Sequence, residues 1–324
     1  MRIVSGMRPT GKLHLGHLSV LENWVRLQKE HECFYFAADW HALSTVFDDP
    51  STIKQNTREM IADWLAAGIN PERSTIFIQS KVPEHAELHL VFSMITPLSW
   101  LERVPTYKDQ VQQLGAQGKD INTYGFLGYP LLQAADILVH RGEAVPVGQD
   151  QLPHLELTRE VARRFNHLFG GVFPEPKAIV AETPLLPGID GRKMSKSYGN
   201  VIMISAEADE VDRLTRMMVT DPARIRKTDP GHPDVCTVYA FHGLYSPARR
   251  PEIEEECKAG RIGCVACKKE LTAALNAALD PVRERRRQLL SRPGYLDEIL
   301  ADGCDRAKKE ARKTMSLVRD ALQV

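Results

Sequence analysis

The first half of the chain alternates short apolar runs with segments of helical periodicity. The runs are short and rich in β-branched or aromatic residues, which is typical of buried strands. The expected strands are residues 2–4, 33–37 (CFYFA), 75–79 (TIFIQ) and 144–147. Apolar residues recur at helical spacing in 18–25, 53–67 and 154–165. Because strands separated by helices of this length pair in parallel, the sequence predicts an α/β fold with a parallel sheet covered by helices.

The second half of the chain has a different pattern. Residues 206–324 contain no convincing strand, and apolar residues recur at helical spacing, as at Leu271, Leu275 and Leu279. We therefore expect a domain boundary near 198–205 and two domains, 1–200 and 201–324. The second domain should be all helical, and its last helix is a candidate to pack back on the first.

Charge and hydropathy exclude some classes of protein. The chain has 42 Lys and Arg residues against 42 Asp and Glu, so any basic surface must be local. The N-terminus has no apolar signal region, and no stretch is long and apolar enough to span a bilayer. We expect a cytoplasmic protein without a membrane segment. In that reducing compartment, the six cysteines are better candidates for metal ligation than for disulfides.

The first expected strand is followed by SGMRPTGKLHLGH. Its glycines allow close approach of the backbone to a ligand, and His14 and His17 share one face of the first turn of a helix. A helix N-terminus that presents amides and two imidazoles suits the phosphates of a nucleotide. The alternative is a pair of surface histidines at a helix start.

Residues 191–197 read GRKMSKS. Lys193 and Lys196, separated by small and polar residues, can deliver paired positive charge to a pyrophosphate leaving group. A solvated basic loop is the alternative for this segment alone. Together with the H-x-G-H stretch, however, it resembles the signature of class I aminoacyl-tRNA synthetases.

Three further stretches resemble tryptophanyl-tRNA synthetases: residues 128–166 (GYPLLQAADILVHRGEAVPVGQDQ and onward), 36–45 (FAADWHALST) and 93–108. The resemblance implies a Rossmann-like catalytic domain and a helical anticodon-binding domain in a homodimer. It also implies ATP-dependent activation of L-tryptophan and transfer to tRNA-Trp. The nearest alternative is a tyrosyl enzyme. More distant ones are an adenylyltransferase and a non-catalytic paralogue that binds RNA or senses redox state through a cluster.

The resemblance also implies roles for individual residues. His14, His17, Lys193, Ser195 and Lys196 would stabilise the phosphates, with Ser197 as a further donor and Mg²⁺ arriving with the ATP. The wider set of ATP-binding residues would add Arg8, Thr10, Gly16, Gly148, Asp150 and Met194. The tryptophan-binding residues would be Val4, Gly6, His41, Tyr129, Gln133, Asp136, Val145, Val147 and Gln151.

Asp136 is the residue on which specificity would depend. An indole offers one N–H donor, and a carboxylate in an apolar pocket is a selective acceptor for it. Gln133, Asp136 and His140 share one polar stripe of a helix, and such a stripe is often simply solvated. The valines have a similar alternative as plain strand core. Two features depart from many tryptophan enzymes. His14 and His17 stand where many of them have threonine and asparagine, and Arg8 stands where many have glutamine.

Four cysteines in the helical half have the spacing C-x20-C-x6-C-x2-C: Cys236, Cys257, Cys264 and Cys267. Four thiolates can hold zinc or a [4Fe–4S] cluster. The uneven gaps favour the cluster, and the pattern resembles that of a cluster-containing subgroup of tryptophanyl-tRNA synthetases, with Zn²⁺ as the alternative. Coincidental buried cysteines are the third interpretation. Cys33 and Cys304 lie outside the pattern and are expected to be a core and a surface cysteine.

The family docks anticodons on its C-terminal helical domain, so basic residues there are candidates to contact RNA phosphates. The candidates are Arg224, Arg226, Lys227, Lys268 and Lys269.

Overall fold

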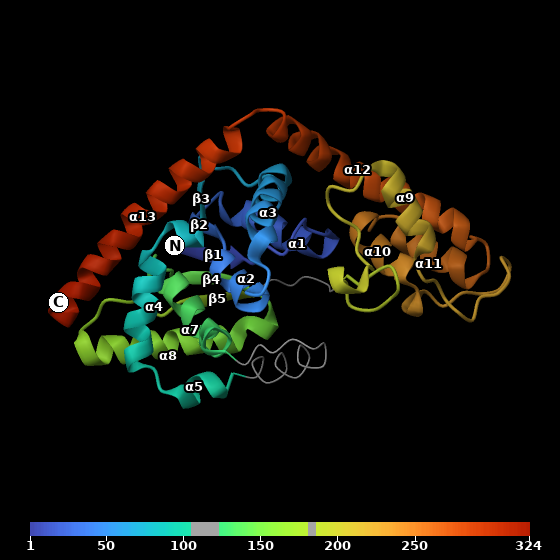
Figure 1. The fold of residues 1–324 in the computed structure, drawn as a ribbon. Coiled ribbons are helices and arrows are strands. Elements are labelled where there is room, and N and C mark those ends of the chain that lie inside the picture. Colours follow the sequence, from blue (N-terminus) through green and yellow to red (C-terminus); the bar gives the residue numbers. More distant parts are fainter. Residues whose placement is uncertain (105–122, 181–185) are drawn as a thin grey trace.

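The computed structural model describes residues 1–104, 123–180 and 186–324, so the end of the 93–108 stretch lies outside it. A parallel sheet with flanking helices is followed by a C-terminal helical region (Figure 1), which confirms the predicted fold class. The strands are β1 (Arg2–Met7), β2 (Glu32–Ala37), β3 (Ser74–Ile78), β4 (Ala144–Val147) and β5 (Lys177–Val180). Helices of the sheet region are α1 (Leu15–Leu27), α2 (Asp39–Val46), α3 (Ile53–Ala67), α4 (Glu84–Ile95), α5 (Leu98–Glu102), α7 (Tyr124–Leu138) and α8 (Leu152–Phe169). Those of the C-terminal region are α9 (Ala208–Met217), α10 (Thr237–Tyr245), α11 (Arg250–Lys258), α12 (Cys264–Leu290) and α13 (Tyr295–Leu322).

The strands lie in the order β3-β2-β1-β4-β5, and every pair is parallel. The four predicted strands are present, and β5 is an additional edge strand. The chain proceeds from β1 toward β2 on one side of the sheet, while β4 lies on the other side of β1. Connections therefore diverge between β1 and β4, which is where open α/β sheets bind ligands, beyond the carboxyl ends of the strands.

Strands β1 to β4 are largely buried on both faces, which explains their nearly continuous apolar sequences. On one face, Tyr35 stacks on Trp24 with ring centroids 4.3 Å apart, and Trp24 meets Trp64 edge-on at 5.2 Å. The hydroxyl of Tyr35 donates to the carbonyl of Trp24 at 3.0 Å, so its polar atom is satisfied inside the core. On the other face, Phe34, Phe36 and Phe77 are packed within a second core.

The C-terminal helices form a second body, and α13 returns from it to the sheet (Figure 1). Helix α12 packs on α3, α9 and α10, whereas α13 packs on β3 and α4. At the closest point, a Cβ at Gly303 would lie 1.8 Å from the carbonyl oxygen of Ile76, so only glycine permits this approach. Cys304 beside it is buried, and its predicted place at the surface is wrong because α13 covers the core.

Within the described parts of the chain, we find no helix with both the length and the apolar character that a membrane span requires.

Candidate functional site

The loop after β1 and the turn after β4 lie at the divergence point of the sheet. Met7 ends β1 and is followed by the glycine-containing loop that leads into α1, while Val147 ends β4 and is followed by Gly148. A Cβ at Gly148 would lie 2.6 Å from a carboxylate oxygen of Asp150, so this turn requires a residue without a side chain. Both predicted ATP-binding turns are therefore at one edge of the sheet.

His14 and His17 cap the N-terminus of α1 together. The backbone N–H of Gly16 donates to Nδ1 of His14 at 3.2 Å, and the N–H of His14 donates to Nδ1 of His17 at 3.3 Å. Burial lowers the pKa of His14 to about 3, helped by His17 and Lys196, and burial followed by Lys196 lowers that of His17 to about 4. Both rings are thus neutral near pH 7. Because each Nδ1 accepts, each ring carries its proton on Nε2 and offers a ligand an uncharged donor.

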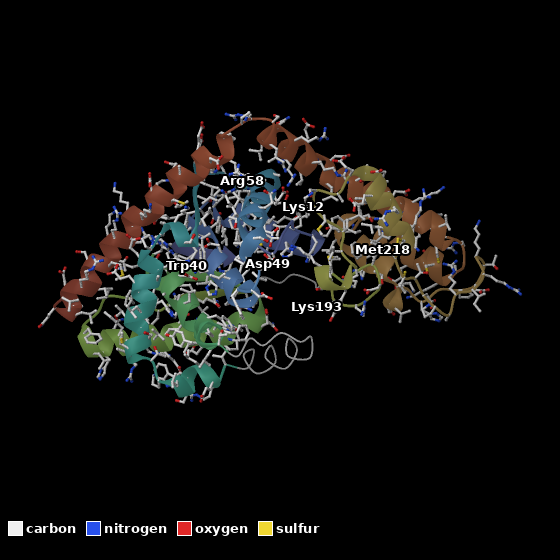
Figure 2. The ribbon with its side chains drawn as sticks, in the orientation of Figure 1. Lys12, Trp40, Asp49, Arg58, Lys193 and Met218 are labelled. Carbon is white, nitrogen blue, oxygen red and sulfur yellow. The ribbon has the colours of Figure 1, made fainter. Side chains whose placement is uncertain are left out.

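The GRKMSKS segment lies against the loop that opens α1. Nζ of Lys196 donates to the carbonyl of Thr10 at 3.0 Å, and a Cβ at Gly16 would meet the sulfur of Met194 at 3.7 Å. Burial lowers the pKa of Lys196, although Asp63 acts in the opposite direction. Lys193 is exposed, on the segment between the sheet and the C-terminal helices (Figure 2). The two predicted phosphate-binding motifs therefore meet in space.

Asn200 holds the lysine segment in place, and the sequence interpretation did not identify it. Its side chain is buried. Its oxygen accepts from the N–H of Ser195 at 2.8 Å, and its amide donates to Asp190 at 2.7 Å and to the carbonyl of Lys193 at 3.1 Å. Its position shortly after a glycine- and lysine-rich loop could have indicated this role, because asparagine side chains often form hydrogen bonds with backbone groups of nearby loops.

A buried ion pair connects the C-terminal helices to the same loop. Oδ2 of Asp63, on α3, accepts the N–H of Leu13 at 2.9 Å, and Oδ1 accepts from Nε of Arg286, on α12, at 2.8 Å. Burial raises the pKa of Asp63, against the effect of the Leu13 and Arg286 hydrogen bonds. The loop after β1 is thus fixed from the opposite side by a residue of α12.

Asp136 is completely buried, so the interpretation of its helix face as a solvated stripe is wrong. Its Oδ1 accepts from Nε2 of Gln79 at 2.7 Å and pairs with Nδ1 of His85 at 2.7 Å. Its Oδ2 pairs with Nε2 of His41 at 2.8 Å. Burial alone would raise the pKa of Asp136, but the hydrogen bonds from His41 and His85 lower it well below its usual range. The carboxylate is therefore ionised inside the protein.

A hollow of about 310 Å³ is lined by His41, the partner of this carboxylate, whereas Asp136 itself does not line it. Its walls include His41, Tyr129 and Trp40, the last of which is labelled in Figure 2. The phenol of Tyr129 pairs with Nε2 of His154 at 2.7 Å, and burial lowers the pKa of His154 to about 4. His154 is a second residue that sequence reasoning missed. His41, which we expect near the carboxylate end of the substrate, lines the hollow and also contacts Asp136.

The remaining predicted tryptophan-binding residues lie around β1, β4 and α7. Val4, Val145 and Val147 are buried in the cores, so their burial fits strand packing as well as a pocket wall. A Cβ at Gly6 would lie 2.4 Å from the ring of Phe36, so this glycine is required by packing within the sheet. Gln133 is half-buried, and the remaining residue, Gln151, donates to Asp150 at 3.0 Å.

The four patterned cysteines are partly buried free thiols. Burial raises the pKa of Cys267 to about 12, and the charges of Cys236, Cys257 and Cys264 act in the same direction, which means that the four thiols are close enough to interact. Among the described residues, however, no group of three or more His, Cys, Asp or Glu side chains is arranged to hold a metal ion. The structure therefore does not support the prediction of a preformed metal site.

Some of the basic residues expected to contact RNA make contacts within the chain. Arg224 donates to the carbonyls of Lys227 and Ile262 at 2.6 Å each, and Lys268 donates to the carbonyl of Arg216 at 2.7 Å. These side chains brace the loops around the cysteines.

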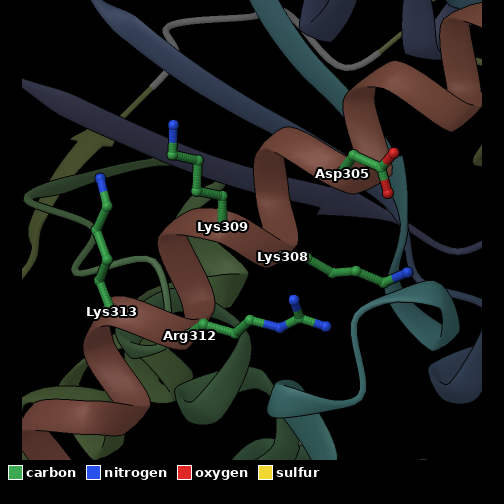
Figure 3. A pocket seen from close by; sticks show the side chains of 5 residues that line it. All are labelled: Asp305, Lys308, Lys309, Arg312 and Lys313. Carbon is green, nitrogen blue, oxygen red and sulfur yellow. The ribbon is translucent and has the colours of Figure 1, made fainter.

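A separate hollow of about 550 Å³ lies on α13 (Figure 3). It is lined by Asp305, Lys308, Lys309, Arg312 and Lys313. Arg312 pairs with Glu84 at 3.1 Å and Lys313 with Glu310 at 2.5 Å, which is typical of a solvated, internally paired helix face.

The sheet, the capped helix start and the lysine segment define a nucleotide-binding α/β enzyme. The family model described as "tRNA synthetases class I (W and Y)" matches residues 1–280. The chain therefore belongs to the family of class I tRNA synthetases for tryptophan and tyrosine.

Several relatives match over the full chain. A tryptophan–tRNA ligase of Thermotoga maritima is 52% identical, covering 100% of this chain and 99% of the relative. One of Aquifex aeolicus is 46% identical, covering 100% of both. The crystal structure of tryptophanyl-tRNA synthetase from Campylobacter jejuni complexed with ADP and tryptophan matches with a TM-score of 0.90 at 33% identity, covering 100% of both chains. These matches confirm the predicted tryptophan–tRNA ligase, whereas the iron–sulfur subgroup has no support from them.

Proposed function

We propose that this chain activates tryptophan with ATP and transfers it to tRNA-Trp at the sheet edge between β1 and β4. The observation that carries the proposal is the contact of Lys196 with Thr10, which joins the GRKMSKS segment to the loop that leads to His14 and His17. The tryptophan carboxylate attacks the α-phosphate, and pyrophosphate leaves. No covalent enzyme intermediate is needed, so the rate comes from positioning and from stabilising phosphate charge.

His14 and His17 act on the α-phosphate as neutral Nε2–H donors, because both have a lowered pKa and an occupied Nδ1. Lys193 and Lys196 stabilise the charge on the β- and γ-phosphates, with Ser195 as a hydrogen-bond donor. Mg²⁺ arrives with the ATP and neutralises phosphate charge when bound. The other ATP-binding residues in this proposal are Arg8, Thr10, Gly16, Gly148, Asp150 and Met194.

For tryptophan, Asp136 is the proposed acceptor for the indole N–H. Its ionised, buried carboxylate supports this role. A substrate side chain without an N–H would leave the buried acceptor site without a hydrogen bond, so that substrate should bind less tightly. Tyr129 and Gln151 hold the α-amino group. The pocket wall consists of Val4, Gly6, Gln133, Val145 and Val147, with His41 between Asp136 and the hollow.

We further propose that residues 1–200 form the catalytic domain and 201–324 the anticodon-binding domain of a cytoplasmic homodimer. The helical character of α9–α12, which follow the last strand of the sheet, supports this division.

For the cysteines, we propose that Cys236, Cys257, Cys264 and Cys267 hold a [4Fe–4S] cluster, with Zn²⁺ as the alternative. Their spacing and their mutual effect on the pKa of Cys267 support it, although the thiols must rearrange to become a ligand set. Iron, sulfide and zinc are measured after anaerobic purification. About four irons and four sulfides per chain support the cluster, one zinc supports the alternative, and neither metal refutes both.

Amino-acid-dependent ATP–pyrophosphate exchange with each of the twenty amino acids tests the activity. We expect exchange with tryptophan and not with tyrosine, and its absence with tryptophan would refute the proposal. Lys196→Met should lower kcat by about 100-fold, as loss of a charge-stabilising donor does in other enzymes. The exposed Lys29, at the far end of α1, provides the matched control Lys29→Met.

A further inference from the structure

The hydrogen bonds of Asp136 leave one acceptor position on a defined oxygen. A carboxylate has about four lone-pair sites. Oδ1 is occupied by Gln79 and His85, while among the described residues His41 alone occupies Oδ2. Asp136 is fully buried, but His41, the partner of Oδ2, lines the hollow of about 310 Å³. The oxygen with the remaining acceptor site is therefore the one that contacts a wall residue of the hollow.

Behind His85 lies a second buried histidine that has had no role so far. Nε2 of His140 is 3.0 Å from Nε2 of His85, so one of these two nitrogens must carry the proton. Burial, followed by the charge of His85, lowers the pKa of His140 well below its usual value. His140 is thus neutral and carries one proton.

The position of that proton follows from the other ring nitrogen. Nδ1 of His140 is buried and has no hydrogen-bond partner within the described part of the chain. A buried N–H without a partner is rarer than a buried acceptor without one, so the proton is on Nε2. His140 then donates to Nε2 of His85, and Nδ1–H of His85 donates to Oδ1 of Asp136. The three side chains form a directed chain of hydrogen bonds.

The rings of this chain are held by aromatic neighbours. His140 stacks on Phe34 with centroids 5.0 Å apart and meets Phe77 edge-on at 5.1 Å. His85 packs beside Phe36 and Phe77, each at 5.8 Å. Strand β2 and strand β3 therefore fix the orientation of both imidazoles, and through them the orientation of the carboxylate.

We propose that His85 and His140 are positioning residues for substrate specificity: they hold Asp136 so that Oδ2 accepts the single N–H of an aromatic amino-acid side chain. The inference rests on the proposed role of Asp136. By donating to Nε2 of His85, His140 keeps the proton of His85 on Nδ1. His85 then donates this proton to Oδ1, so the remaining acceptor site of the ionised carboxylate is on Oδ2. Neither histidine touches the substrate.

The test compares two substrates in ATP–pyrophosphate exchange, tryptophan and 3-benzothienylalanine, in which sulfur replaces the indole N–H. The measured quantity is the ratio of kcat/KM for the two. We expect His140→Phe to lower this ratio by about tenfold, as expected for weakening one hydrogen bond to a charged group. Phenylalanine suits the aromatic surroundings of this site, so the variant should fold. His85→Leu should lower the ratio further, and His85→Asn, which keeps a donor near Nδ1, should restore part of it.

A merely structural role for the histidines would lower kcat/KM for both substrates equally and leave the ratio unchanged, which would overturn the proposal. His242, a buried histidine of α10, provides the control His242→Phe, which should not change the ratio. Asp136→Asn distinguishes the proposed role of Asp136 in binding the substrate N–H from the proposed positioning role of the two histidines. If it leaves the ratio unchanged, the role of Asp136 itself is refuted. If it lowers the ratio while His140→Phe does not, only the positioning role is refuted.

Discussion

Asn200 should control how well the GRKMSKS segment is ordered for ATP. Asn200→Ala removes the acceptor for the N–H of Ser195 and the donor to the carbonyl of Lys193. Each neutral hydrogen bond contributes about 0.5 to 1.5 kcal/mol, so the two backbone bonds together hold the loop by about 2 kcal/mol. We assign no further share to the bond with Asp190, because that carboxylate is accessible to water.

The two hydrogen bonds of Asn200 stabilise the loop conformation in which Lys193 and Lys196 reach the phosphates. About 2 kcal/mol corresponds to about a 30-fold change in an equilibrium or rate constant. We therefore expect Asn200→Ala to lower kcat/KM for ATP by about 30-fold in pyrophosphate exchange, with little change in KM for tryptophan.

The matched control is Asn166, which holds the loop after α8 in the same way. Its amide donates to the carbonyl of Phe173 at 2.8 Å, and its oxygen accepts from the N–H groups of Val172 and Phe173 at 2.9 and 3.0 Å. Asn166→Ala should cost similar stability without a specific effect on ATP. If both variants change the ATP kinetics equally, or if Asn200→Ala changes nothing, the reasoning is refuted.

Three further predictions concern stability. The pKa of His154 is lowered to about 4, so the folded protein favours the neutral imidazole. The contribution of this histidine to stability is complete above about pH 6.5 and is lost as the pH falls toward 4. In urea unfolding we expect the free energy of unfolding to fall by about 2 kcal/mol between pH 7 and pH 5. Arg286→Leu leaves Asp63 buried without its cation, and we expect a loss of about 3 to 5 kcal/mol in the same assay. Gly303→Ala places a methyl group against the carbonyl of Ile76, and a loss of about 3 kcal/mol should appear as a lower Tm.

Each of these has its own contradicting result. A free energy of unfolding that falls equally between pH 7 and 5 in His154→Gln would show that this histidine is not responsible. The exposed pair of Arg58 and Asp297 should contribute less than about 1 kcal/mol, so equal losses for Arg58→Leu and Arg286→Leu would contradict the burial argument. An unchanged Tm in Gly303→Ala would mean that α13 is free to shift away from β3.

The sequence predicted strands β1 to β4 and the helices between them because their periodicity is strong and most of their residues are buried. Strand β5 was not predicted. Its four residues, KAIV, lie at the edge of the sheet and none is fully buried, so the segment lacks the buried, continuous apolar character of the other strands. Its pairing with β4 comes from tertiary contacts that local sequence does not encode.

The site was predicted in its motifs and not in its supporting residues. The pairing of His14 with His17 follows from their spacing at the start of α1. The proximity of the turns after β1 and β4 follows from strand order, once the fold is known. The burial of Asp136 was expected from the family resemblance alone, since a polar stripe on a helix is usually solvated. Here Gln79, His41 and His85 come from other segments to satisfy it. Long-range partners of this kind leave no periodic signal.

The packing of α13 on the sheet also has a consequence for protein synthesis. Ala307, Ala311 and Met315 of α13 belong to the same core as Phe36 and Phe77, and they leave the ribosome long after β3 does. During that interval the nascent chain exposes an aromatic sheet face that its own later helix must cover. Such transiently exposed apolar surface is a target for chaperones and a route to aggregation. The last helix to be translated is therefore the one that ends this exposure.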